Sequence, residues 1–147
     1  MCLSIPNCML FRMKSERCVI VLDDDPSARR GIARLLCTAG YNVRVYASAN
    51  EFLDFITKED SGCLVLDARM PGMCGYELKA ELDRLNIDLS LIVLTGDDDP
   101  DTRNKANKMK AVGFFRKPVD GAALLDAVEW ALRSSSTKSN DTETENN

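Results

Sequence analysis

Five polar side chains could together bind a cation and handle a phosphoryl group, and each lies just beyond a short apolar run. They are Asp23, Asp24, Asp67, Thr95 and Lys117. Carboxylates held close together repel one another unless a cation neutralises them, and a hard divalent ion such as Mg²⁺ prefers their oxygens. A carboxylate can attack phosphorus, while an ammonium and a hydroxyl hold the phosphoryl oxygens. If these residues meet in space, they predict a Mg²⁺-dependent site with Asp67 as the nucleophile.

The apolar runs before these residues have the composition of buried strands. They are rich in Val, Ile, Leu and Phe, and several lack the alternation of a strand that faces water on one side. Segments with helical spacing of apolar residues lie between them, which predicts βα units around a parallel sheet. The expected strands cover residues 18–22, 42–46, 63–66, 90–94 and 111–115. The predicted fold class is therefore α/β, a doubly wound parallel sheet.

The order of the strands decides whether the acids meet. In an open parallel sheet, ligands bind beyond the carboxyl ends of the strands, at the point where the strand order reverses. With the order 2-1-3-4-5, the first and third strands are neighbours at that point. Asp23, Asp24 and Asp67 would then crowd into one cleft. Asp25 precedes Pro26, so we interpret it as a helix cap instead of a ligand.

Two segments differ from the rest of the pattern. The expected helix at 99–109 has little to bury beyond Ala106 and Met109, so it should be the least stable helix. The segment 134–147 is polar and lacks periodicity, so we expect a disordered tail or the start of a truncated linker. The domain should cover residues 17–133, and residues 1–16 should form a flexible N-terminal extension.

Composition excludes several classes of protein. A net charge of -4 and a pI near 4.9 argue against direct nucleic-acid binding, and no apolar run is long enough to span a membrane. The absence of histidine excludes a His-based catalytic triad. None of the six cysteines forms a CxxC pair, so we expect them to be reduced packing residues of a cytoplasmic protein.

Four segments together resemble the receiver domains of two-component response regulators. They are LDDDPSAR (22–29), LVLDARMPGMCGYEL (64–78), IVLTG (92–96) and FFRKPV (114–119). The resemblance covers residues 18–133 and implies the flavodoxin-like (βα)5 fold with strand order 2-1-3-4-5. It also implies a cytoplasmic signalling domain that is not an enzyme beyond its own phosphorylation and dephosphorylation.

The same resemblance implies a role for each matched residue at the metal site. Asp23, Asp24, Asp67 and the backbone carbonyl of Arg69 would bind Mg²⁺ or Mn²⁺. Asp67 would accept a phosphoryl group from a sensor histidine kinase or a phosphotransfer protein.

The resemblance further implies a switch. Thr95 and Lys117 would bind the phosphoryl oxygens, and Phe114 would swing inward when Thr95 is drawn toward the phosphate. The reporting surface would be the fourth helix, fifth strand and fifth helix, which would control a homodimer or an output partner.

Arg69, two residues beyond Asp67, departs from the commonest family pattern, and Asp97 lies two residues beyond Thr95. These two positions flank the path of hydrolytic water in the family, so we expect an unusual lifetime of the acyl phosphate. Arg69 could reach over the site, and Asp97 could pair with it.

Three other classes of protein compete with the receiver interpretation. A phosphorylation-independent docking module of the same fold remains open. A flavin-binding protein is disfavoured because three consecutive acids from Asp23 would repel the cofactor phosphate. A haloacid-dehalogenase-type phosphatase would need Asp-x-Asp, which Asp67-Ala-Arg does not provide.

Overall fold

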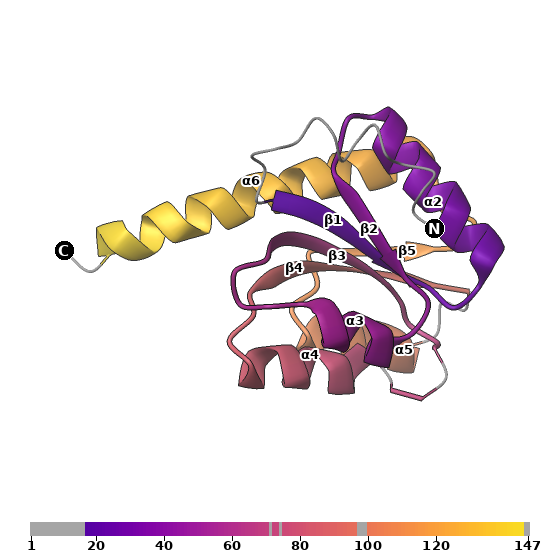
Figure 1. Ribbon diagram of the computed structural model, residues 1–147, viewed down its shortest axis with the longest axis horizontal. Helices are drawn as coiled ribbons and strands as arrows, with labels where there is room; N and C mark the ends of the chain where they lie inside the picture. Colours follow the sequence, from indigo (N-terminus) through magenta and orange to yellow (C-terminus); the bar gives the residue numbers. More distant parts are fainter. Residues whose placement is uncertain (1–16, 71, 74, 97–99, 146–147) are drawn as a thin grey trace.

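The sheet has five parallel strands in the order β2-β1-β3-β4-β5 (Figure 1). The structure is a computed structural model that describes residues 17–70, 72–73, 75–96 and 100–145. The strands are β1 (Arg17–Leu22), β2 (Val43–Tyr46), β3 (Ser61–Asp67), β4 (Leu89–Thr95) and β5 (Gly113–Arg116). The predicted class and strand order are confirmed. The expectations for residues 1–16 and for Asp97 lie outside the described residues.

Helices cover both faces of the sheet. They are α2 (Pro26–Thr38), α3 (Ala49–Phe55), α4 (Gly75–Arg84), α5 (Pro100–Lys108) and α6 (Gly121–Glu145). Figure 1 shows α2 and α6 on one face and α3, α4 and α5 on the other. The fourth and fifth helices expected from the sequence are thus α5 and α6.

The side chains of β1 explain why both faces are covered. Val19 and Val21 belong to the core beneath α2 and α6, while Ile20 and Leu22 belong to the core beneath α3, α4 and α5. All four side chains are fully buried. Successive strand residues point to opposite faces, so an uninterrupted apolar strand needs a helical layer on each side.

Local signals fix the first helix. The Asp25 carboxylate accepts a hydrogen bond from the Ser27 amide at 3.2 Å, and Pro26 stands in the first turn. The interpretation of Asp25 as a cap is confirmed. Among the described residues, no helix has the length and apolar character needed to cross a bilayer.

Two features differ from the sequence-based expectations. Helix α6 continues to Glu145, and its final part projects beyond the sheet (Figure 1). A helix already nucleated over the sheet can be extended at low cost, so a polar segment can follow it. Cys37 is disulfide-bonded, which corrects the expectation that all cysteines are reduced, whereas Cys18 and Cys63 are buried thiols.

Candidate functional site

Asp23 and Asp67 stand beyond the ends of neighbouring strands. Leu22 of β1 pairs with Leu66 of β3 in parallel register, so the residue that follows each of them reaches the same edge of the sheet. The two acids are 1% and 7% exposed, respectively. Asp24 is exposed at the mouth of the site.

Lys117 bridges the two buried carboxylates. Its Nζ lies 2.9 Å from Asp23 Oδ2 and 3.2 Å from Asp67 Oδ2. The Lys117 amide donates to the Thr95 carbonyl at 2.7 Å, which ties the segment after β5 to the end of β4. The Lys117–Pro118 peptide bond is cis. Residues from three separate βα turns therefore converge on one cluster.

Backbone amides orient the other oxygen of each buried acid. The Asp25 amide donates to Asp23 Oδ1 at 3.0 Å. The Arg69 amide donates to Asp67 Oδ1 at 3.1 Å. Arg29 of α2 donates from Nη1 to the Asp23 carbonyl at 2.7 Å, so the turn after β1 is also held by the helix that follows it.

The acidic cluster fits a hard divalent cation. One carboxylate oxygen from each of Asp23, Asp24 and Asp67 can be chosen so that all lie within 4.8 Å of one another. Mg²⁺ binds one or two carboxylates and keeps several waters, and an all-oxygen donor set in a shallow site suits it. The residues present therefore fit the ion that the sequence predicts.

The site shifts the pKa values of its central pair. Burial raises the pKa of Asp67, the Arg69 amide opposes this rise, and the negative charge of Asp23 adds to it. Partial burial lowers the pKa of Lys117, but its hydrogen bond to Asp23 and the nearby carboxylate charges outweigh burial and raise it. Lys117 therefore remains a cation between two acids at neutral pH.

The predicted switch residues lie on the face covered by α3, α4 and α5. Thr95 ends β4 and is fully buried. Phe114 of β5 pairs in register with Val93 of β4 and packs, half-buried, against the core of that face. The guanidinium of Arg103 on α5 lies 4.8 Å from the centroid of the Phe114 ring.

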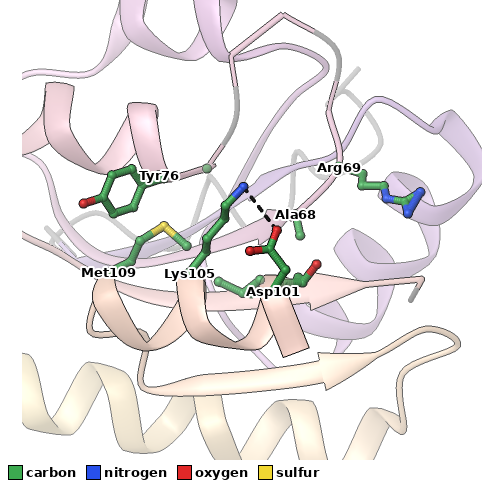
Figure 2. A pocket seen from close by; sticks show the side chains of 9 residues that line it. Ala68, Arg69, Tyr76, Asp101, Lys105 and Met109 are labelled. Carbon is green, nitrogen blue, oxygen red and sulfur yellow. Dashed lines mark ion pairs between the residues drawn. The ribbon is translucent and has the colours of Figure 1, made fainter. Parts of the chain in front are cut away.

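A pocket of about 280 Å³ lies beside the acidic cluster, between α4 and α5. Ala68 and Val93 belong to its apolar lining, and Arg69 also borders it. Figure 2 shows Lys105 and Asp101 facing each other at this pocket, where their charged atoms are 3.6 Å apart. Arg69 is exposed. Its expected pairing with Asp97 remains a prediction, because Asp97 lies outside the described residues.

The structure brings together most of the residues predicted for the site. Asp23, Asp24, Asp67 and Lys117 form one cluster. Sequence reasoning missed Arg29 and Arg103. Neither arginine stands at a strand end, and no local motif distinguishes a helix arginine that contacts a neighbouring element from one that faces solvent.

The fold and the site define the class of protein: a flavodoxin-like parallel sheet with an acidic, cation-compatible cleft at its switch point. The family model described as "Response regulator receiver domain" matches residues 19–129. The chain therefore belongs to the response regulator receiver domain family.

Several proteins are similar to this chain. Transcriptional regulatory protein FixJ of Azorhizobium caulinodans is 41% identical over 114 residues, covering 78% of this chain and 54% of that protein. Nodulation protein W of Bradyrhizobium diazoefficiens is 41% identical over 110 residues, covering 75% and 48%. The chain thus spans about half the length of these curated relatives.

Solved structures give the same assignment. A low-resolution structure of response regulator StyR has a TM-score of 0.80 and 37% identity, covering 90% of this chain and 67% of that one. The crystal structure of FixJ-N has a TM-score of 0.74 and 35% identity, covering 82% and 96%.

Proposed function

We propose that Asp67 accepts a phosphoryl group from the phosphohistidine of a sensor histidine kinase or a phosphotransfer protein. The observation that carries this proposal is the convergence on Lys117 Nζ of one buried carboxylate from β3, 3.2 Å away, and one from the turn after β1, 2.9 Å away. An exposed lysine and carboxylate would be an ordinary surface salt bridge. Two buried acids that share one lysine are costly to maintain, which supports a functional site that binds negatively charged groups.

Asp23, Asp24, Asp67 and the backbone carbonyl of Arg69 would hold Mg²⁺, or Mn²⁺ in its place. The fit of the acidic oxygens, all within 4.8 Å, supports this assignment for the three side chains. When bound, the ion supplies positive charge that offsets the charge on the phosphoryl oxygens.

In the transfer step, a carboxylate oxygen of Asp67 attacks phosphorus as the bond from phosphorus to the donor imidazole nitrogen breaks. The new phosphorus–oxygen bond makes an acyl phosphate, and the electron pair of the broken bond leaves with the imidazole. The Arg69 amide holds the carboxylate in orientation. Lys117 is already at the site and would bind one phosphoryl oxygen, while the Thr95 hydroxyl would donate to another.

Phosphorylation would then change the surface formed by α5, β5 and α6. Movement of Thr95 toward the phosphoryl group opens space into which Phe114 turns, and the altered surface controls homodimerisation or an output partner. Two of the relatives are named transcriptional regulatory proteins, and the segment that matches this chain covers 54% and 55% of their lengths. We therefore assign this chain the switching step in the cytoplasm, with no direct contact to nucleic acid or membrane.

Beryllofluoride, an anion that mimics a bound phosphoryl group, tests this function. We expect NMR shifts around Thr95 and Phe114 to respond to beryllofluoride only when Mg²⁺ is present, and Asp67→Asn to abolish the response. Asp88→Asn is the matched control, because Asp88 is exposed before β4, at the opposite end of the strands. A wild-type protein without any Mg²⁺-dependent response would refute phosphorylation and favour a phosphorylation-independent docking module.

A further inference from the structure

Arg103 contacts the residue expected to move in the switch. Its guanidinium carbon lies 4.8 Å from the centre of the Phe114 ring, within the range of a cation–π contact. Arg103 is exposed on α5, and Phe114 is half-buried on β5. The contact therefore joins two elements of the proposed reporting surface.

The helix that carries Arg103 is weakly anchored. Ala106 is the buried residue within α5, and Met109 follows just after the helix. The ion pair between Asp101 and Lys105 lies within the helix itself and does not hold it to the sheet. The contact of Arg103 with Phe114 therefore adds a link between this sparsely buried helix and β5.

We propose that Arg103 is a positioning residue that holds Phe114 in its half-exposed position and so sets the balance between the resting and switched conformations. The proposal rests on the proposed function, because it concerns the equilibrium that phosphorylation shifts. A guanidinium stacked on the ring stabilises only the conformation in which the two groups face each other. Turning the ring toward the sheet interior breaks the contact, so Arg103 favours the resting state.

The size of the effect follows from the exposure of the contact. A cation–π contact at an exposed site changes an equilibrium roughly two- to fivefold. Because a ligand specific for the switched state binds in proportion to the population of that state, removing Arg103 should tighten such binding by the same factor.

The contact itself can be tested without any ligand. The ring current of Phe114 should move the δ-proton resonances of Arg103 upfield in the full-length chain, and Phe114→Leu should return them to ordinary values. Unshifted Arg103 resonances in the wild type would overturn the proposal, whatever the outcome for phosphorylation.

Binding of beryllofluoride with Mg²⁺ tests the consequence. We expect Arg103→Gln to lower the dissociation constant about two- to fivefold. Lys105→Gln is the matched control. It also removes one positive charge from α5, but it leaves the contact between Arg103 and Phe114 in place. Loss of a positive charge near an anion site would by itself raise the dissociation constant for beryllofluoride. A lower dissociation constant in Arg103→Gln therefore indicates positioning of Phe114, and a higher one indicates general electrostatics.

Two further variants complete the test. Arg103→Lys should fall between wild type and Arg103→Gln, because lysine keeps the charge but not the planar stacking. In a Phe114→Leu background, Arg103→Gln should have no effect. An equal effect with and without the Phe114 ring, or an equal effect of Lys105→Gln, would overturn the proposal. Absence of any beryllofluoride binding by the wild type would refute the proposed function, leaving the resonance test of the contact to stand alone.

Discussion

Lys117 makes it possible for two acids to be buried side by side. Asp23 and Asp67 would repel each other strongly in a site this shielded from water, and the ammonium between them offsets that repulsion. A cation bound by the same acids would share this role. The chemistry of the site and the stability of the fold therefore depend on the same charges.

Removing Lys117 should destabilise the protein, and Mg²⁺ should restore part of the loss. In Lys117→Ala, the carboxylates of Asp23 and Asp67 lose their shared counter-ion. Without metal, we therefore expect the free energy of unfolding to fall by about 1–3 kcal/mol. The partial exposure of Lys117 keeps this loss below the full cost of breaking a buried ion pair. Chemical denaturation with and without Mg²⁺ measures both effects.

Lys79→Ala is the control for this experiment. Lys79 pairs with the exposed Asp83 one turn along α4, so its removal should change stability by less than about 0.5 kcal/mol and leave the Mg²⁺ response unaltered. Equal losses for the two lysine variants would contradict a special role for Lys117.

The thiol of Cys63 should be unreactive in the folded protein. Burial raises its pKa to about 12, with a further rise from Cys18, so at pH 8 the thiolate is roughly three orders of magnitude rarer than for an ordinary cysteine. Mass spectrometry after iodoacetamide treatment should find Cys63 unmodified in the native chain and modified in denaturant. Rapid native labelling at Cys63 would show that β3 is open to solvent.

The same shift predicts a pH dependence of stability. Because the folded pKa of Cys63 lies above that of an unfolded thiol, near 8.5, the unfolded chain releases this proton first as pH rises. The contribution of Cys63 is therefore complete below about pH 8.5 and is lost as pH rises toward about 12. Cys63→Ala should show a shallower loss of stability over that range; identical slopes would reject the assignment.

At the scale of elements, the pairing of the strands positions the site, and one glycine allows β1 and β3 to lie close together. Gly62 of β3 has φ +132°, and a Cβ there would lie 2.1 Å from the Cys18 carbonyl oxygen of β1. Only glycine fits that backbone and that spacing. The pairing of β1 with β3, which brings Asp23 to Asp67, therefore depends on a residue far from the chemistry.

Gly62→Ala should destabilise the fold by at least about 2 kcal/mol, from strain and from the clash with β1. Gly31→Ala is the opposite control, because a Cβ added at Gly31 in α2 would meet no neighbouring atom within 4 Å, and it should stabilise by about 0.5–1 kcal/mol. Urea denaturation of both variants compares them. A stable Gly62→Ala protein would contradict the register of β1 and β3.

Helix α5 should exchange its amide protons fastest among the helices that cover the sheet. Its buried contacts are sparse, whereas α4 buries Leu78 and Leu82 in the same core. Hydrogen exchange followed by NMR should give lower protection in α5 than in α4. Higher protection in α5 would remove the physical basis for an easily switched surface.

The sequence was sufficient for the parallel α/β sheet and for the polar residues at the strand ends, because buried strands and the residues that follow them carry strong local signals. The strand order, by contrast, followed from the family resemblance. It did not predict Arg103 against Phe114 or Arg29 on the Asp23 carbonyl. Those contacts depend on the exact position of each helix over the sheet. The spacing of apolar residues determines that position only to within about one helical turn. The course of α6 to Glu145 also escaped prediction, since composition alone disfavours helix there.

At the scale of the whole molecule, one sheet connects the acidic cleft to the proposed reporting surface. β4 ends in Thr95 and pairs with β5, which carries Phe114 and leads to Lys117. Figure 1 shows α5 and α6 on opposite faces beside this edge of the sheet. A change at Asp67 can therefore reach both helices through adjacent strands, without a distant relay.

The most direct test of the account is phosphorylation of the chain by acetyl phosphate, followed by intact-mass measurement. With Mg²⁺ present, the wild type should gain the mass of one phosphoryl group, and chelation of the metal or the Asp67→Asn substitution should abolish the gain. The same gain in Asp67→Asn, or none in the wild type, would contradict the assignment of Asp67 as the phosphoacceptor.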